Sequence, residues 1–225
     1  MRHVDDPRPA EAALPVEYVD VGDRAEIPAA PAGWRYLDFL GGTRHLRCYL
    51  VPRDLPRSRF MAEHPDQLDE SLHPIYDHDG IVARQDASYA LPGFYIVSLD
   101  RQYRSMDEMG ELLHLRVFLI LREIRAGLRN RLGVEHAHLY HEEKPDESSN
   151  VHYWLMPART DVTEKASVIM RLDLRKYLSQ FRFPTERDTI CAYNRAMRDY
   201  LHAVDLRSRD ALLKRHLEGQ FPAEV

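Results

Sequence analysis

A long helical stripe is the clearest hydrophobic pattern in the chain. Through residues 106–132, apolar side chains recur at spacings of three and four, which is typical of a helix with one buried face. Ser105 and Glu108 stand three residues apart, as in a capping box. Gly133 is suited to end a helix. The pattern therefore predicts one helix over residues 106–132.

Short segments with the pattern of strands lie on both sides of this helix. Residues 81–86 and 94–99 precede it, and residues 136–141 and 150–156 follow it. Each is rich in apolar or alternating residues and is bounded by turn-forming ones. The order strand, strand, helix, strand, strand predicts an α+β domain, in which one antiparallel sheet holds these strands and the helix packs across it. We expect the last two strands to be neighbours.

The rest of the chain divides around this segment. Residues 1–44 are interpreted as an N-terminal tail and extension, residues 45–160 as the domain that holds the sheet, and residues 161–225 as a helical C-terminal extension packed on it. Residues 53–79 combine prolines, histidines and many charges, which predicts a long irregular loop. The final helices are amphipathic, so core packing or a dimer face is expected of them.

Composition excludes several classes of protein. The chain has 225 residues, 44% of them hydrophobic and 30% charged, as in ordinary globular proteins. Its formal net charge of −5 gives no general reason to bind nucleic acid or an anionic membrane. No apolar run approaches the roughly 18 residues of a membrane span, and the first residues lack the apolar stretch of a signal peptide. Two distant cysteines, Cys48 and Cys191, make a disulfide scaffold improbable and favour the cytoplasm.

The candidate chemistry lies on the last strand. Asn150, His152 and Trp154 alternate with apolar residues, and a period of two puts all three on one face of a strand. The bland interpretation is a surface histidine beside a packed indole. The functional one is a pocket floor, because imidazole serves as base, nucleophile or ligand near neutral pH.

The order of elements and these residues resemble the histidine-triad superfamily of nucleotide hydrolases and transferases. In that superfamily two strands, a long helix and two strands end in H-x-H-x-H, which here reads Asn150-x-His152-x-Trp154. The segment before the helix is similar to the superfamily's "AF-D-x-x-P-x-a-P-x-H" stretch, with Asp86 at the acidic position and Phe94 where many members have histidine. The resemblance covers roughly residues 45–160.

The resemblance implies a role for each matched residue. His152 corresponds to the histidine that attacks the α-phosphate of a nucleotide, which divides one difficult displacement into two easier ones. Asp86 corresponds to the residue that holds the ribose hydroxyls. Asn150 and Trp154 would orient the nucleophile and the leaving group, but neither carries charge. Further candidate substrate-binding residues are Ser88, Ser148, Ser149, His138, His141 and Arg159.

Three hypotheses stay open on the sequence alone. The first is a nucleotidyl hydrolase or transferase acting through His152. The second is a nucleotide-binding or ligand-binding module on the same scaffold without turnover. The third is a metal-dependent enzyme in which His136, His138 and His141 supply ligands. The first is preferred, with no cofactor and no resident metal, a nucleotide or nucleotide-linked small molecule as partner, no nucleic acid or membrane, and a possible homodimer.

Overall fold

The computed structural model describes residues 15–17, 29–37, 39, 47–55, 57–143, 151–158, 187–218 and 220. Two antiparallel sheets lie in this part of the chain. The smaller one has the order β1-β3-β2, with β1 at Pro15–Glu17, β2 at Trp34–Leu37 and β3 at Arg47–Pro52. The larger one has the order β4-β5-β6-β8-β7. Its strands are β4 (Tyr76–His78), β5 (Ile81–Gln85), β6 (Tyr95–Leu99), β7 (Ala137–Glu142) and β8 (His152–Pro157).

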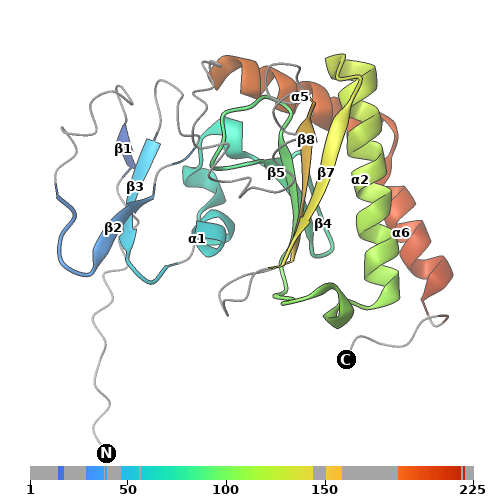
Figure 1. Cartoon of the computed structure of the whole chain (residues 1–225), viewed down its shortest axis with the longest axis horizontal. Helices are drawn as coiled ribbons and strands as arrows, with labels where there is room; N and C mark the ends of the chain where they lie inside the picture. Colours follow the sequence, from blue (N-terminus) through green and yellow to red (C-terminus); the bar gives the residue numbers. More distant parts are fainter. Residues whose placement is uncertain are drawn as a thin grey trace, which may run out of the picture.

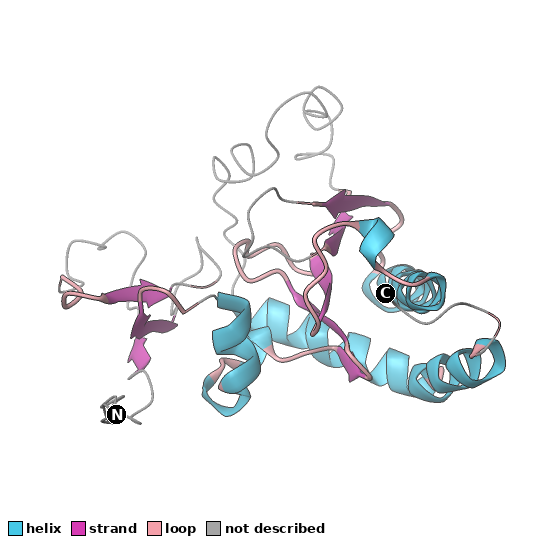
Figure 2. Ribbon diagram, turned by 90° about the horizontal axis from the view of Figure 1, so that it is seen from below, coloured by secondary structure: helices cyan, strands magenta, loops and turns pink. Residues whose placement is uncertain are grey.

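Helices surround the larger sheet. The α-helices are α1 (Arg57–Glu63), α2 (Glu111–Leu132), α5 (Arg187–Ala203) and α6 (Leu206–Leu217), and three short 3₁₀ turns are η2 (Pro65–Gln67), η3 (Glu70–Leu72) and η4 (Met106–Glu108). Figures 1 and 2 show α2 against one face of the sheet and α1 between the two sheets. The predicted α+β class, the four predicted strands and the pairing of the last two strands are thus confirmed.

One hydrophobic core lies between the larger sheet and the helices α2, α5 and α6. From β8 it takes Tyr153 and Leu155, which are buried together with the apolar stripe of α2. At Gly127, a Cβ atom would come within 2.5 Å of Met197 Sδ and 2.8 Å of Tyr200 Cδ1. Glycine at this position therefore lets α2 and α5 approach closely.

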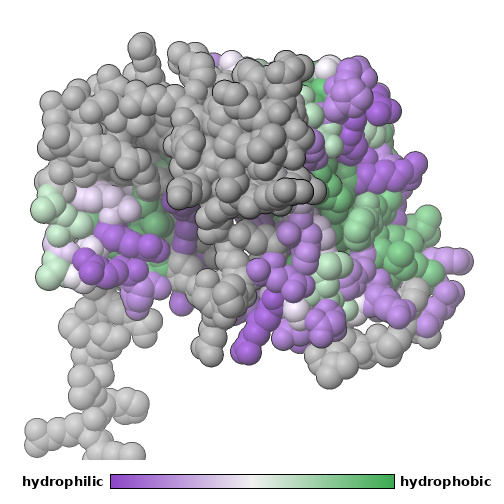
Figure 3. Space-filling view, in the orientation of Figure 1, coloured by the Kyte–Doolittle hydropathy of each residue, from purple (hydrophilic) through white to green (hydrophobic). Residues whose placement is uncertain are grey.

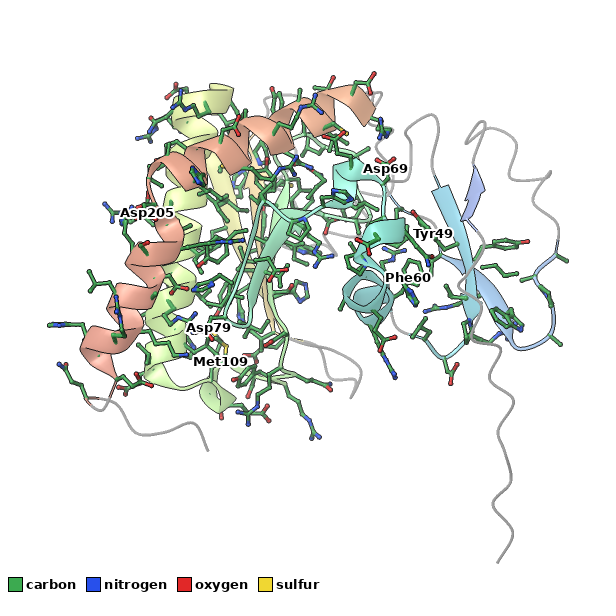
Figure 4. All side chains as sticks on the ribbon, turned by 180° about the vertical axis from the view of Figure 1, so that it is seen from behind. Tyr49, Phe60, Asp69, Asp79, Met109 and Asp205 are labelled. Atoms are coloured by element: carbon green, nitrogen blue, oxygen red, sulfur yellow. The ribbon has the colours of Figure 1, made fainter. Side chains whose placement is uncertain are left out.

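A second core covers the opposite face of the same sheet. It joins Trp154 and Met156 of β8 to Phe94 and to apolar side chains of the smaller sheet and α1. Tyr49 of β3 and Phe60 of α1 meet there with ring centroids 4.9 Å apart, as Figure 4 shows. Every residue of β8 is consequently buried. The two alternating faces of β8 pack into two different cores, so the face that carries His152 and Trp154 is buried as well.

The structure corrects two details of the sequence interpretation. The long helix begins at Glu111 with Gly110 as its N-cap, and Ser105 instead precedes the separate turn η4. Residues 53–79 are not an irregular loop, because they hold α1, η2, η3 and β4. The first described strand after residue 44 is β3, which pairs with β1 and β2 in the smaller sheet. Gly133 does end α2, in the left-handed conformation with φ 65°.

A buried ionic cluster fixes α6 against α2 and the sheet. Asp210 of α6 is fully buried, and its carboxylate accepts hydrogen bonds from Arg116 Nε and Nη2 at 2.8 and 2.9 Å. The hydroxyl of Tyr76 donates a third bond to it, at 2.8 Å. At the edge of this cluster Lys214 pairs with Asp79, at 2.7 Å. The charge of Asp210 is thereby compensated within the core.

The start of α5 is held by the loop before β4. Arg187 Nε donates to both carboxylate oxygens of Asp69 at 2.8 Å, and Asn194 Nδ2 donates to the carbonyl of Ser71, also at 2.8 Å. Burial of Asp69 favours its neutral form, but hydrogen bonds from Ser71 and Arg187 outweigh this and hold the pKa of Asp69 below its ordinary value. Figure 4 shows Asp69 beside the end of this helix.

The outer surface of α2 and β7 carries exposed apolar side chains. Leu115, Phe118 and Leu139 are 43%, 49% and 47% exposed, and hydrophobic residues gather on this side of the molecule in Figure 3. None of the described helices is both long enough and apolar enough to cross a membrane.

Candidate functional site

Strand register places His152 and Trp154 on one face of the larger sheet. His152 pairs with Ser98, and Ser98 pairs with Val82. Directly paired residues point to the same side of a sheet, so these three form one row across it. Trp154, Ile96 and Arg84 form the next row. Since all of them lie opposite Tyr153 and Leu155, this face is the one that α2 does not cover.

His152 lies at the start of β8, an interior strand of the larger sheet, and is only 5% exposed. Its ring stands 5.4 Å from the Trp154 ring, centroid to centroid, at an interplanar angle of 57°. This packing limits the orientations that the imidazole can adopt. A fixed imidazole is a precondition for attack along one line.

Trp154 is packed, as one of the two interpretations of the sequence expected, but its partners are the residues of the second core. Its indole meets the ring of Phe94 edge to face, with centroids 5.8 Å apart, and Phe94 stacks in turn on Tyr89. Phe94 occupies the position where many triad proteins have histidine. The substitution of aromatic residues at both positions therefore makes one apolar cluster beside His152.

Asp86 lies on the same face as His152, two rows further along the strands. Its backbone N–H donates to the carbonyl of Phe94 at 2.7 Å, four residues from Ser98 in the His152 row. At about 3.3 Å per residue this corresponds to roughly 13 Å. The Asp86 Oδ1 atom accepts the backbone N–H groups of Ser88 and Tyr89 at 2.8 and 3.1 Å. The Asp86 carboxylate therefore stabilises the turn at Ser88 and Tyr89 and also lies on this side of the sheet.

Ser88, a predicted contact, belongs to that turn. Its side chain is exposed, and its hydroxyl accepts a hydrogen bond from Arg57 Nη1 of α1 at 2.8 Å. The loop after β5 is therefore tied to the first helix. Arg57 also stands over the Phe39 ring, 5.2 Å from its centroid.

The histidines of β7 separate onto two faces. His138 pairs with Met156 and faces the same side as Trp154, whereas His141 pairs with Tyr153 and faces the α2 side. The His141 ring lies 5.2 Å from the Tyr153 ring, and its Nε2 is 3.6 Å from Glu143. The expectation that His141 lines the pocket of His152 is wrong, because the period of two puts it behind the sheet.

His138 stays a candidate for that pocket. Its Nε2 atom is buried and has no hydrogen-bond partner in the described part of the chain. His138 and Tyr140 lie on the same face, with ring centroids 5.9 Å apart. Burial raises the pKa of the Tyr140 phenol, which keeps it neutral and able to donate.

The histidines do not converge as metal ligands. His136 is exposed before β7 begins, and strand parity separates His138 from His141. Among the described residues there is no group of three or more histidine, cysteine, aspartate or glutamate side chains that could hold a metal ion. The proposed cluster of His136, His138 and His141 is therefore not a metal site.

Four predicted residues, Asn150, Ser148, Ser149 and Arg159, lie outside the described residues. Sequence reasoning also missed one residue on this face, Arg84. It directly follows the apolar residues Ile81–Ala83 of β5, two positions before Asp86. A charged residue at an inward position of a central strand was the signal that could have identified it.

Comparisons of the chain with known proteins find matches in structure but not in sequence. No family model and no curated protein sequence matches it. Among solved structures, 21 chains match. One is the crystal structure of a Hit-like protein involved in cell-cycle regulation from Bartonella henselae, with unknown ligand: it has a TM-score of 0.43 and 12% identity, and the match covers 63% of this chain and 95% of that one.

A second structural match is the NitFhit protein of C. elegans, with a TM-score of 0.39 and 13% identity. The match covers 76% of this chain but 31% of that protein, so this chain spans about a third of its length. Similarities at this level carry no argument about function.

Proposed function

We propose that the chain is a nucleotide-processing enzyme, a nucleotidyl hydrolase or transferase that acts at the α-phosphate through His152. The observation that carries the proposal is the register of the larger sheet, which puts His152, Trp154 and Asp86 on one face, away from α2. The sequence resemblance to the histidine-triad superfamily supplies the roles.

The spacing along the strands suits a nucleotide. Roughly 13 Å separates the rows of Asp86 and His152, at about 3.3 Å per residue. Two strand spacings of about 4.8 Å also separate β5 from β8, so the two backbones lie roughly 16 Å apart. A hydrogen bond at one end and an attacking atom at the other each take about 3 Å, which leaves roughly 10 Å for the two side chains, a sugar and its 5′-phosphate. Asp86 would bind the ribose hydroxyls while the imidazole of His152 faces the phosphorus.

The proposed reaction has two displacements. A ring nitrogen of His152 forms a bond to the α-phosphorus as the bond to the leaving group breaks, which releases that group. Water, or another acceptor, then attacks the same phosphorus and releases the nucleotide from the imidazole. A histidine suits this route because neutral imidazole is nucleophilic near pH 7 and its phosphorus adduct is labile.

A second candidate function is nucleotide binding without turnover. The packing of Trp154 against Phe94 favours it, because an indole held in an apolar cluster is poorly placed to assist a leaving group. The two candidates are separated by incubating the protein with nucleoside 5′-phosphoramidates and dinucleoside polyphosphates. Release of nucleoside monophosphate supports the enzyme, whereas binding without release supports the binding module.

Replacing Asp86 with alanine is expected to weaken binding of ribonucleotides by about tenfold or more, since charge-assisted hydrogen bonds contribute about 1.5–3 kcal/mol. Binding of 2′,3′-dideoxynucleotides, which lack the diol, should change little. Titration calorimetry with both ligands measures this difference. Equal losses for both ligands would show that Asp86 only shapes the loop through Ser88 and Tyr89.

We also propose that the chain forms a homodimer through the exposed apolar surface of Leu115, Phe118 and Leu139. Within the described residues, β7 is the edge strand of the larger sheet, and an open edge beside apolar side chains suits pairing with a second copy about a two-fold axis. Phe118→Glu should halve the mass measured by light scattering. Leu212→Glu, at an exposed apolar residue of α6, is the matched control and should leave the dimer intact; a monomeric wild-type protein would contradict the proposal.

A further inference from the structure

Arg84 is a partly buried arginine that makes no salt bridge within the described residues, and Asp77 of β4 is an acidic neighbour that interacts with it only through its charge. The Nη1 atom of Arg84 is buried and has no hydrogen-bond partner in that part of the chain. Buried polar groups in native proteins are nearly always paired, so an unpaired one calls for an explanation. Burial lowers the pKa of Arg84, with Asp77 acting in the opposite direction, yet an arginine stays charged at neutral pH.

The position of Arg84 relates it to both ends of the proposed nucleotide site. Arg84 lies two residues before Asp86 and two residues after Val82, the residue in the His152 row. It is thus midway between the Asp86 and His152 rows on the same face. Across the sheet, two strand spacings of about 4.8 Å separate β5 from β8. A long arginine side chain on β5 and one phosphate group bound to it can together reach from β5 to His152 on β8.

Arg84 carries the positive charge on this face of strands β5, β6 and β8. Strands β5, β6 and β8 place there Val82, Arg84, Ile96, Ser98, His152, Trp154 and Met156, among which Arg84 is the one permanent cation. Asn150 and Trp154 replace the flanking histidines of the triad pattern, and neither can carry positive charge. A phosphoryl group on this face would therefore depend on Arg84 for charge compensation.

We propose that Arg84 is the phosphate-binding residue of this face and takes the phosphate of a nucleotide held between Asp86 and His152. The inference rests on the proposed function and names the group that compensates the charge of its substrate. A guanidinium donates two parallel hydrogen bonds to phosphate oxygens, which accounts for a buried Nη1 that has no hydrogen-bond partner among the described residues.

The test compares ligands with and without phosphate. Binding of the four ribonucleoside 5′-monophosphates, the corresponding nucleosides and inorganic pyrophosphate is measured by calorimetry for the wild type, Arg84→Met and Arg84→Lys. Arg84→Met should weaken monophosphate and pyrophosphate binding about ten- to a hundredfold and leave nucleoside binding unchanged. Arg84→Lys should recover part of the loss, since it restores charge but not the bidentate geometry.

A matched control and a stability measurement exclude a structural role. Arg198 of α5 also has a buried, unpartnered Nη1, but it lies on another element, so Arg198→Met should bind all ligands as the wild type does. Arg84→Met should melt at the same temperature as the wild type or higher, because removing an unpaired buried charge does not cost stability. A lower melting temperature together with unchanged phosphate binding would assign Arg84 to structure and overturn the inference.

The remaining outcomes are equally decisive. Nucleotide binding that is equal in wild type and Arg84→Met overturns the role of Arg84 but leaves the proposed function standing. Pyrophosphate binding that depends on Arg84, without binding of any nucleotide, upholds the anion site and contradicts the proposed function. A wild-type protein that binds neither pyrophosphate nor nucleotide contradicts both.

Discussion

Replacing His152 with alanine is expected to abolish turnover of nucleoside phosphoramidates and dinucleoside polyphosphates, because it removes the atom that attacks phosphorus. Trp154→Phe, which keeps the ring packed against Phe94 but removes the N–H donor, should retain some turnover, as should Asn150→Ala. Losing one positioned hydrogen bond to a developing charge costs on the order of a hundredfold to a thousandfold. Steady-state rates of product release for the three variants measure the difference.

Trp154→Phe is preferable to alanine because Trp154 belongs to the second core. Removal of the whole indole would leave a cavity, and large-to-small changes of this kind cost about 3–5 kcal/mol, so lost activity would be confounded with unfolding. If His152→Ala retained the activity of Trp154→Phe, His152 would be a packing or positioning residue and another nucleophile would be required.

Replacing Asp210 with alanine is expected to lower the free energy of unfolding by about 3–5 kcal/mol, the usual cost of removing one partner of a buried ion pair. The charge of Arg116, whose side chain is only 6% exposed, would be left without its bidentate partner, and the Tyr76 hydroxyl would lose its acceptor. Urea denaturation followed by circular dichroism measures the change.

Lys214→Ala provides the matched control for this cluster. Lys214 pairs with Asp79 at the surface, where the two side chains are 38% and 40% exposed, and exposed pairs contribute about 0–1 kcal/mol. A loss for Asp210→Ala no larger than that for Lys214→Ala would contradict the view that Arg116 and Asp210 hold α6 in place.

Much of the larger sheet was predictable because its patterns are local. The strands β5, β6, β7 and β8 have apolar or alternating runs, and α2 has a continuous stripe, so their type and order follow from periodicity. The start of α2 was less predictable. Ser105 and Glu108 satisfy the spacing of a capping box, but the chain makes the 3₁₀ turn η4 there and starts the helix after Gly110.

The smaller sheet and the second core depend on contacts between distant segments. On one side β3 pairs with β1, whose residues lie 30 or more positions before it, and on the other side it pairs with β2, which lies closer in the sequence. Nothing in the sequence of β3 itself selects these two partners. The prolines and charges of residues 53–79 are typical of an irregular loop, and the helices in this segment are too short to give a clear hydrophobic period. Burial of both faces of β8 is a consequence of that packing.

For the candidate site, sequence pattern indicated the strand but not the neighbours across it. The alternation of His152 and Trp154 predicted their common face, whereas the separation of His138 from His141 required the register of β7 against β8. Arg84 was missed for the same reason. Its relation to Asp86 is local, but its relation to His152 passes through Ser98 and Ile96 of β6.

A covalent adduct on His152 is the sharpest evidence for the proposed reaction. The wild-type protein is mixed with a nucleoside 5′-phosphoramidate, quenched within the first turnover under conditions that preserve phosphorus–imidazole bonds, digested and analysed by mass spectrometry. We expect the peptide containing His152 to gain the mass of one nucleoside monophosphate, and the same peptide from Trp154→Phe to gain it more slowly. Turnover by the wild type without any such adduct, or an adduct on a different residue, would contradict the role of His152 as nucleophile.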